Sequence, residues 1–386
     1  MHDICIIGAG ASGLTAAVSA ARAGAGKDIT VIEKNSSAGR KVLATGAGRC
    51  NLTNAQADGM KEVLAFFSSI GIAVKSTEEG LFYPMSERAE DVVRALEGEA
   101  GSAGVSFILG AEVTGVRHED AFEIDLGGSV IRAEKLIIAA GGKAAPQYGT
   151  TGDSYRFARS LGHSVNKVFP VLTGLKTADA VRSLKGVRVR AGCTLKRDGA
   201  AAAEEHGEVQ FGEGYVSGIC VMNLSRELKY GQGMREKYEL VLDLLPGMDE
   251  ERVKAALMHR SGILWMKSGD ILNSIIPSKL ASEVIRRAGI DPEIPAADIS
   301  ESEISAAAHC LKGFTLSVSG AQGWKNAQCT AGGVPKEEID PDTMESRIIP
   351  GLYFTGEALD YAGPCGGFNL NNAWLTGLKA GRAAAK

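Results

Sequence analysis

Three glycine-rich segments of the chain combine backbone N–H groups with charged side chains, and that combination suits the binding of phosphate groups. The first, residues 8–13 (GAGASG), has the spacing G-x-G-x-x-G and is followed 20 residues after its last glycine by Glu33. In such a segment Gly8 permits a tight turn, Gly10 lets backbone approach a pyrophosphate, and Gly13 lets a helix pack closely on a strand. The Glu33 carboxylate would accept hydrogen bonds from ribose hydroxyls, which argues against a 2′-phosphate at this position. We therefore expect a dinucleotide site at this turn.

The second segment, residues 39–54 (GRKVLATGAGRCNLTN), lies shortly after Glu33. Arg40 and Lys41 stand beside a glycine-rich loop, and cations in that setting suit a ligand that carries a pyrophosphate. The alternative is a flexible, charged surface loop. Its position next to the expected dinucleotide site favours a binding role.

The third segment is at the C-terminal end, where residues 351–357 (GLYFTGE) precede residues 365–371 (CGGFNLN). A strand that ends in Gly356-Glu357 can place a carboxylate on a sugar-like chain. A glycine turn that opens a helix presents free N–H groups and the positive end of the helix dipole. Either feature alone fits an ordinary helix start, but together with the first segment they indicate one ligand that spans both ends of the chain.

The elements around these segments indicate an α/β fold. An apolar run at 3–8, a helix at 13–24 and a strand at 28–33 form a βαβ unit. Helices are expected at 60–70 and 88–100. Strands are expected within 105–139 as the runs FILGAEVTGVRHED, AFEIDL, SVIRA and KLIIAA, the last of them ending in a glycine turn.

The middle of the chain differs from its ends. Residues 187–195 alternate apolar and polar side chains, which predicts a half-exposed strand, and EVQFGEGYV and YELVLDLL predict further strands. Helices are expected at 249–260, at 270–288 with a break at Pro277, and at 300–311 with Ser300 and Glu303 as a capping box. The predicted fold is a Rossmann-like domain interrupted by a mostly β insert that carries a helical subdomain. The predicted Rossmann-like domain comprises residues 1–165 and 325–386. The predicted β insert comprises 166–248 and 313–324, and the helical subdomain comprises 249–312.

Composition narrows the function classes. The formal net charge of −4 gives no electrostatic case for nucleic acid. No apolar run approaches the length that a membrane span needs, and residues 1–20 make a poor signal peptide. The seven cysteines are scattered without ligand spacing, which favours a reduced cytoplasmic protein with no metal site.

The pairing of the first and third segments resembles the two-dinucleotide-binding-domain flavoproteins. The runs GRKVLATGAGRCNLTN, LIIAAGGKAAPQYGTTGDSY and GLYFTGEALD, with GGFNLNNAW, are similar to a narrower bacterial group, the NAD(P)/FAD-dependent or aminoacetone oxidase-like FAD-binding oxidoreductases. This resemblance covers nearly the whole chain.

The resemblance implies a role for individual residues. Glu33 would hold the adenosine ribose, Val113, in a strand after Gly110, would meet adenine through its backbone, and Glu357 would bind the ribityl hydroxyls. Arg40 and Lys41 would lie near the diphosphate or ribityl chain. The full set of expected cofactor contacts is Gly8, Gly10, Ala11, Ser12, Gly13, Glu33, Lys34, Arg40, Lys41, Ala47, Gly48, Val113, Ala140, Gly141, Gly356, Glu357, Gly367, Phe368, Asn369 and Leu370.

The resulting hypothesis is an FAD-dependent oxidoreductase acting on a small molecule. Arg49 and Asn51 are the candidate catalytic residues, as polar groups near the reacting edge of the flavin. NAD(P)H is the candidate transient reductant, and an activated double bond such as an enone is the candidate acceptor. Two alternatives stay open: an amine or ketoamine oxidase that uses oxygen, and a non-catalytic FAD-binding redox or interaction protein.

Four further features have simpler interpretations. Cys50 and Cys365 lie in the expected flavin loops, where small side chains beside the cofactor are a simpler interpretation than a redox-active thiol. His163 is expected to be a cap or core residue. Four cationic residues are expected to form a solvated strand face: Arg182, Lys185, Arg188 and Arg190. The minority alternative is that they form a docking patch for the phosphates of NAD(P)H.

Overall fold

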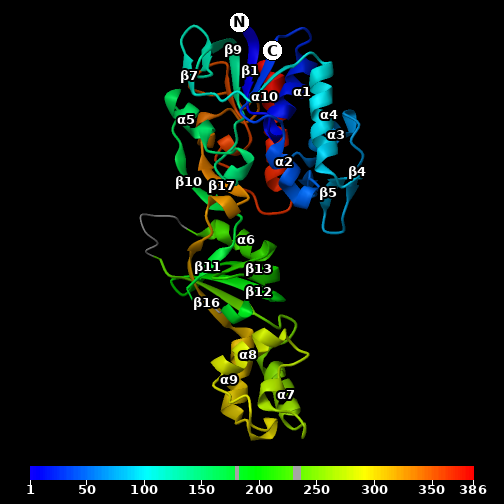
Figure 1. Cartoon of the computed structure of the whole chain (residues 1–386), viewed down its shortest axis with the longest axis vertical. Helices are drawn as coiled ribbons and strands as arrows, with labels where there is room; N and C mark the ends of the chain where they lie inside the picture. Colours follow the sequence, from blue (N-terminus) through cyan, green and yellow to red (C-terminus); the bar gives the residue numbers. More distant parts are fainter. Residues whose placement is uncertain (179–181, 229–235) are drawn as a thin grey trace. The chain divides into compact units, whose positions relative to one another are not determined.

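The computed structural model describes residues 1–178, 182–228 and 236–386, and these residues form two compact units. The first unit contains Met1–Pro170 and Trp324–Lys386, so it is built from both ends of the chain. The second unit is the inserted stretch Val171–Gly323 (Figure 1). The predicted fold class, a Rossmann-like domain interrupted by a mostly β insert, is confirmed.

A seven-stranded sheet forms the centre of the first unit. Its order is β6 (Ser106–Leu109), β2 (Ile29–Glu33), β1 (His2–Ile7), β9 (Val130–Ile138), β8 (Phe122–Asp125) and β7 (Gly115–His118), with β18 (Leu352–Phe354) also pairing with β9. The strands β6, β2, β1, β18 and the second half of β9 run parallel. Strands buried on both faces favour continuous apolar runs, and the end of β9 has one; β2 is buried throughout, although it contains Thr30 and ends at Glu33.

Two strand predictions in this sheet were wrong in detail. The runs SVIRA and KLIIAA form one strand, β9, because its first half pairs antiparallel with β8 while its second half pairs parallel with β1. The run FILGAEVTGVRHED is two strands, β6 and β7, separated by a loop. The chain turns at Gly110, whose φ is +71°, and the N–H groups of Gly110 and Ala111 donate to the carbonyls of Asn35 and Glu33.

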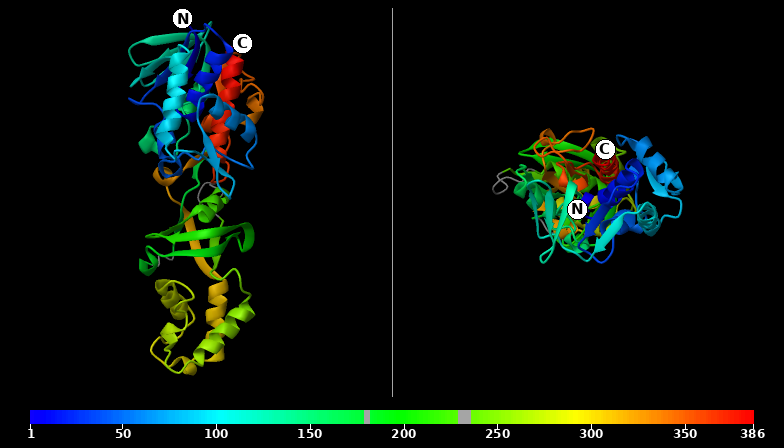
Figure 2. Two further views of the ribbon diagram at one scale, coloured as in Figure 1. Left: turned by 90° about the vertical axis from the view of Figure 1, so that its right-hand side faces the viewer. Right: turned by 90° about the horizontal axis from the view of Figure 1, so that it is seen from above.

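Helices α1 (Ala11–Ala23), α10 (Phe368–Ala384) and α4 (Ala89–Ser102) lie side by side in the first unit (Figure 2). Glycine lets α10 approach α1 very closely. A Cβ at Gly377 would lie 2.4 Å from the Ser12 carbonyl oxygen, and one at Gly381 would lie 2.3 Å from that of Ala16. The N-terminal and C-terminal motifs are therefore held together by direct backbone packing.

Smaller elements complete the first unit. Those that the sequence did not indicate are the helix α2 (Arg40–Ala44), a small sheet of β3 (Thr53–Asn54), β5 (Leu81–Pro84) and β4 (Val74–Ser76), and the pair β10 (Asn166–Val171) and β17 (Cys329–Gly333). Helix α3 (Met60–Ser69) packs on β3 and α10, and helix α5 (Asp153–Ser160) packs on β7.

The second unit contains a closed six-stranded barrel. Its strands are β11 (Leu175–Thr177), β14 (Tyr215–Ser217), β13 (Ala200–Phe211), β12 (Arg188–Arg197), β15 (Tyr238–Asp243) and β16 (Phe314–Ala321). Its helices are α6 (Ile219–Leu224), α7 (Glu250–Ser261), α8 (Ser278–Arg287) and α9 (Glu301–Lys312).

Barrel strands and helices of the second unit share one apolar core. The boundary of a separate helical subdomain at 249–312 therefore stays a prediction. Helix α8 begins only after Pro277, and the capping box of Ser300 and Glu303 is present at the start of α9. No helix among the described residues has the length and apolar character required to cross a membrane.

Candidate functional site

The first glycine turn joins β1 to α1. A Cβ at Gly13 would lie 1.9 Å from the Gly8 carbonyl oxygen, and one at Gly8 would lie 2.5 Å from the carbonyl oxygen of Ala139, directly after β9. A Cβ at Gly10 would meet no atom within 4 Å. Packing therefore requires glycine at 8 and 13, whereas the backbone at Gly10 faces open space, as the approach of a ligand needs. Ala11 and Ser12 begin α1 directly after it.

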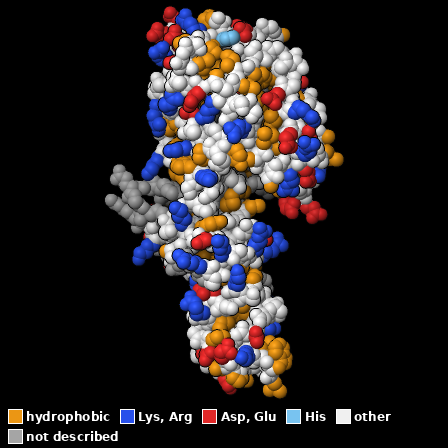
Figure 3. Space-filling view, in the orientation of Figure 1, with side chains coloured by type: hydrophobic (Ala, Val, Ile, Leu, Met, Phe, Trp, Pro, Cys, Tyr) orange, Lys and Arg blue, Asp and Glu red, His pale blue; other side chains and the backbone are white. Residues whose placement is uncertain are grey.

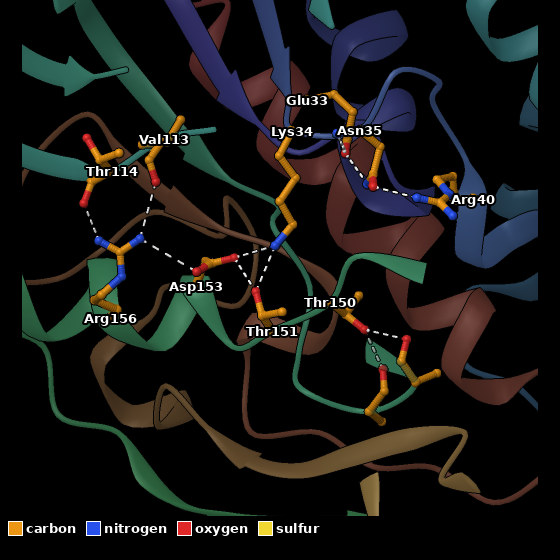
Figure 4. A network of polar contacts seen from close by, with 12 residues as sticks. Glu33, Lys34, Asn35, Arg40, Val113, Thr114, Thr150, Thr151, Asp153 and Arg156 are labelled. Atoms are coloured by element: carbon orange, nitrogen blue, oxygen red, sulfur yellow. Dashed lines mark hydrogen bonds and ion pairs between the residues drawn. The ribbon is translucent and has the colours of Figure 1, made fainter. Parts of the chain in front are cut away.

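Glu33 lies at the end of β2, against this turn. Its Oε2 accepts a hydrogen bond from the Ala9 N–H at 2.8 Å, and its Oε1 accepts from the Asn35 N–H and side-chain amide at 2.9 and 2.6 Å. Arg40 donates to Asn35 Oδ1 at 2.7 Å, so the predicted diphosphate cation is fixed to the same loop (Figure 4). Each carboxylate oxygen can accept about two hydrogen bonds, which leaves Glu33 capacity for a ligand hydroxyl.

Lys34 points away from Glu33, toward the start of α5 (Figure 4). Its Nζ lies 2.6 Å from Asp153 Oδ2 and 2.7 Å from Thr151 Oγ1. Burial opposes ionisation of Asp153, but the hydrogen bonds from Lys34 and Thr151 and the nearby positive charges outweigh it and lower its pKa. Among the described residues Lys34 therefore forms an ion pair with Asp153. A contact of Lys34 with the cofactor stays a prediction.

Val113 lies in the loop between β6 and β7, not in a strand as predicted, because the chain has already turned at Gly110. Its side chain is buried, and its carbonyl accepts a hydrogen bond from Arg156 Nη2 at 3.2 Å. Arg156 also donates to the Thr114 carbonyl through Nη1. The backbone that the resemblance assigns to adenine is thus fixed by a side chain of α5.

Lys41 of α2 and Glu357 bring the second and third segments together. Their Nζ and Oε1 atoms are 2.5 Å apart, and both side chains are mostly buried, with exposures of 24% and 20%. Burial alone would lower the pKa of Lys41, but the charge and hydrogen bond of Glu357 outweigh it, so the pKa lies above its ordinary value. Lys41 is therefore charged at neutral pH.

The second carboxylate oxygen of Glu357 is left available. Oε2 is buried and has no hydrogen-bond partner among the described residues, and a Cβ at Gly142 would lie 2.6 Å from it. The Tyr155 hydroxyl donates to the Glu357 carbonyl at 2.8 Å and fixes that backbone. A buried acceptor without a donor is costly, so this atom is suited to a ligand hydroxyl.

Gly356 touches the first glycine turn. A Cβ there would lie 2.9 Å from Ser12 Oγ, and Thr355 Oγ1 donates to the same Ser12 oxygen at 3.0 Å. The Gly356 N–H donates to Thr376 Oγ1 of α10 at 3.0 Å. The structure therefore brings together Ser12, Gly356 and the middle of α10.

The loop after α2 has an unusual backbone. Gly46, Ala47, Gly48 and Cys50 all have positive φ, between +57° and +86°, and two of these four are not glycine. Such a cluster is typically kept where surrounding contacts enforce it, and it is often found at functional sites. Burial raises the pKa of the Cys50 thiol to about 12, against a smaller lowering by a hydrogen bond from Thr45, so the group is a neutral thiol at pH 7. This favours the simpler interpretation of Cys50.

The two candidate catalytic residues lie in different surroundings. Arg49 is exposed, and its guanidinium lies over the Tyr83 ring at 4.9 Å. Asn51 is buried, and with its amide in the orientation that suits its neighbours, its nitrogen donates to the Phe82 carbonyl at 3.1 Å and its oxygen accepts from the Gly367 N–H at 3.2 Å. Asn51 thus supports the start of α10, and a role in the reaction stays a prediction for both residues.

The start of α10 is shaped by its own loop. Gly367 has φ +95° and packs against Thr53, where a Cβ would lie 2.8 Å from that carbonyl oxygen. The Asn369 side chain accepts from the Gly363 N–H and donates to the Gly363 carbonyl, both at 2.9 Å. Phe368 and Leu370 are half-buried. The loop before α10, a helix of 17 residues, therefore holds the first turn of that helix in a fixed position.

Ala140 and Gly141 follow β9, close to the first glycine turn, and Gly141 has φ +74°. The neighbouring loop is held by a residue that sequence reasoning missed. Thr330 Oγ1 accepts from the N–H groups of Lys143 and Ala144 at 2.8 and 3.0 Å. Nothing in the sequence signals this contact, because it joins residues 187 and 186 positions apart.

Other predictions concern residues outside this cluster. His163 is a core residue, as expected, bonded to Glu338 at 2.7 Å and to Ser346 at 2.8 Å. The seven cysteines all lie among the described residues and form no disulfide, and the described residues include no cluster of His, Cys, Asp and Glu that could hold a metal.

Cations are scattered over the visible face of the barrel segment, with acidic side chains among them (Figure 3). Lys185 pairs with Glu213 at 2.8 Å, and Arg188 lies 3.6 Å from Glu208. These contacts fit a solvated face of mixed charge.

Comparison with known proteins gives consistent matches. The family model described as "HI0933-like protein Rossmann domain" matches residues 2–64 and 59–383. A 3-dehydro-bile acid delta(4,6)-reductase of Clostridium scindens is 36% identical, and the match covers 100% of both chains. A ribosomal RNA dihydrouridine synthase of Escherichia coli is 29% identical over 96% of this chain and 95% of that one. These matches confirm the predicted family resemblance.

Among solved structures, a 3-ketosteroid delta1-dehydrogenase of Sterolibacterium denitrificans superimposes with a TM-score of 0.51 at 12% identity, covering 100% of this chain and 99% of that one. This similarity concerns the fold alone. Because one relative acts on ribosomal RNA, the expected absence of a nucleic-acid partner stays a prediction.

Proposed function

The chain belongs to the HI0933-like family of Rossmann-type flavoprotein oxidoreductases, and we propose that it uses FAD to reduce a C=C double bond conjugated to a carbonyl, with NAD(P)H as reductant. The observation that carries the proposal is the contact of Lys41 with Glu357, which joins the two glycine-rich ends of the chain into one site. A long dinucleotide is the class of ligand that needs both ends.

The residues present fit FAD. Gly10 leaves open space at the start of α1, and Glu33 has acceptor capacity beside it. The buried Glu357 Oε2 needs a donor, which a ribityl hydroxyl would supply. In this proposal Glu33 holds the ribose, Arg40 and Lys41 lie along the diphosphate and ribityl chain, and Glu357 binds the ribityl hydroxyls.

FAD, when bound, supplies the hydride-transfer chemistry, and the protein supplies position and electrostatics. The free N–H groups in the first turn of α10, at Phe368, Asn369 and Leu370, would stabilise negative charge beside them. Their loop is fixed by Asn369, so this donor array needs little reorganisation. The positive charge of Lys41 is compensated by Glu357 and adds little net charge to the site.

The names of two relatives support the choice of acceptor. One is a delta(4,6)-reductase of a 3-dehydro-bile acid, and the other is a dihydrouridine synthase. In both, the name describes a double bond that lies in conjugation with a carbonyl and gains hydrogen. We carry this shared chemistry to the present chain, with the steroid-type enone as first candidate because that relative is the more similar of the two.

The test is anaerobic reduction of the purified yellow protein, followed at about 450 nm, where oxidised flavin absorbs. NADH or NADPH should bleach the flavin, and a 4,6-dien-3-one steroid should restore the colour in stoichiometric amount. Uridine-containing ribosomal RNA and an amine panel form the other arms. Bleaching by amines but by neither nicotinamide would overturn the proposal in favour of an oxidase, and reoxidation by RNA alone would move the acceptor to uridine.

A further inference from the structure

The loop 110–114, between β6 and β7, is held from two sides. At its start, the N–H groups of Gly110 and Ala111 donate to the carbonyls of Asn35 and Glu33, at 2.9 and 3.1 Å. The loop therefore lies against the same Glu33 whose carboxylate supports the first glycine turn. This places Val113 on the adenosine side of the proposed cofactor site without reference to any relative.

The other side of the loop is held by one side chain. Arg156, in the first turn of α5, donates to the carbonyls of Val113 and Thr114 through two nitrogens of its guanidinium. The planar fork of arginine can serve two such acceptors at once, which a lysine ammonium does less well. Both carbonyls therefore accept hydrogen bonds from Arg156. The conformation of the loop is thus fixed by the Arg156 side chain at one end and by the Glu33 carbonyl at the other.

Arg156 is itself oriented by Asp153, whose Oδ1 lies 3.5 Å from Nη2. The other oxygen of Asp153 bonds Lys34 at 2.6 Å, and Lys34 directly follows Glu33 (Figure 4). One carboxylate thus links the loop after β2 to the loop after β6. These are the two backbone segments that border the ribose and base of a dinucleotide bound at the first glycine turn.

We propose that Arg156 and Asp153 are positioning residues for the adenosine half of FAD, acting through the backbone of Val113–Thr114 and through Lys34. This inference rests on the proposed function, because it takes FAD as the ligand. Neither side chain is assigned a contact with the cofactor. Their effect is to hold the base-binding loop in its bound shape before the ligand arrives, which lowers the cost of binding.

The experiment measures binding of ADP and FAD to apoprotein, by calorimetry and by quenching of flavin fluorescence. ADP carries the adenosine and diphosphate without the flavin, so it reports on this half of the site alone. For Arg156→Met we expect both dissociation constants to rise about tenfold, which corresponds to about 1.4 kcal/mol. Arg156→Lys should give a smaller rise, because lysine keeps the charge but not the fork.

Arg159→Met is the matched control. Arg159 lies on the same helix and is exposed, and its side chain makes no hydrogen bond or ion pair with another described residue. Glu357→Gln is the second control, since it should weaken FAD and leave ADP unchanged. Thermal unfolding of each apoprotein separates positioning from folding.

The proposal is supported if Arg156→Met weakens ADP while its apoprotein unfolds at the temperature of the Arg159→Met variant. It is overturned if Arg156→Met binds ADP as tightly as Arg159→Met. It is also overturned if ADP affinity and apoprotein stability fall together in Arg156→Met and Arg156→Lys restores neither. Failure of the wild-type protein to bind FAD would instead refute the proposed function, and the ADP comparison would still be readable.

Discussion

The contact between Lys41 and Glu357 yields the sharpest prediction. Lys41→Met keeps the length and apolar stem of the side chain but removes its charge, and it leaves Glu357 with neither of its carboxylate oxygens bonded by a described side chain. We expect the apoprotein to lose stability. We also expect the double variant Lys41→Met/Glu357→Gln to lose less free energy of unfolding than the two single variants lose in sum.

The magnitude follows from burial. Removing one partner of a fully buried ion pair costs about 3–5 kcal/mol, whereas exposed pairs contribute about 0–1 kcal/mol. With exposures of 24% and 20%, this pair lies between the two limits, and about 2 kcal/mol is the expected cost of Lys41→Met. For a folding unit of 150–250 residues, each kcal/mol lowers the midpoint by about 2–4 °C.

The pH dependence of this cost has a definite sign. The pKa of Lys41 is raised in the folded protein above its ordinary value of 10.5. A lysine whose folded pKa is raised contributes stability that is fully present below the unfolded pKa and is lost as pH rises through the folded pKa. As far as Lys41 is concerned, the difference between wild type and Lys41→Met should therefore stay constant from neutral pH up to about 10.5 and shrink above it.

The assay is thermal and urea unfolding of the four apoproteins of the double-mutant cycle, with Lys61→Met as the charge control. Lys61 is an exposed residue of α3, and its loss should change stability by less than about 0.5 kcal/mol. A coupling energy within about 0.5 kcal/mol of zero would refute the reasoning, since independent sites add to that accuracy.

Three further predictions concern other parts of the first unit. The pKa of Asp153 is lowered in the folded protein, so its contribution to stability is present above its ordinary value of 3.8 and is lost as pH falls through the lower folded value; an acid titration of wild type against Asp153→Asn should converge only in that range. Because burial raises the pKa of Cys50 to about 12, the native protein should resist alkylation there at pH 8, and mass mapping that finds Cys50 modified as fast as an unfolded control would contradict this. Gly377→Ala should destabilise by about 1–3 kcal/mol because its Cβ would lie 2.4 Å from the Ser12 carbonyl oxygen, whereas Gly98→Ala on α4, where a Cβ meets nothing within 4 Å, should stabilise by up to about 1 kcal/mol; chemical denaturation that ranks the two alike would contradict the packing argument.

Local signals in the sequence were sufficient for the first glycine turn. The order strand, glycine turn, helix and strand ending in an acid is a set of neighbours in sequence, and neighbours in sequence fix the backbone around residues 8–13. The observed clash distances at Gly8 and Gly13 agree with the reason for which glycine was expected there. The capping box of Ser300 and Glu303 was predictable for the same reason, since it joins residues three positions apart.

Contacts between distant residues were not predictable in this way. The support of Lys143 and Ala144 by Thr330, and of the Glu357 backbone by Tyr155, depends on tertiary packing that no local spacing encodes. The strand errors at β6, β7 and β9 have a related cause. An apolar run shows that a segment is extended, but the partners on either side decide where the strand turns or continues.

The way the first unit is assembled explains why the site depends on both ends of the chain. Gly377 and Gly381 pack α10 on α1, Ser12 meets Gly356, and Lys41 meets Glu357, so both of the first two glycine-rich segments have partners from the C-terminal end. A ligand that bridges these partners stabilises the folded form in proportion to its own binding, by about 2.7 kcal/mol at a concentration one hundred times its dissociation constant. The available Oε2 of Glu357 comes from the C-terminal end of the chain, and the open space at Gly10 lies at the N-terminal end. A cofactor long enough to contact both Oε2 of Glu357 and the backbone at Gly10 would therefore hold the two ends of the chain together. A nucleotide confined to the N-terminal turn cannot do this.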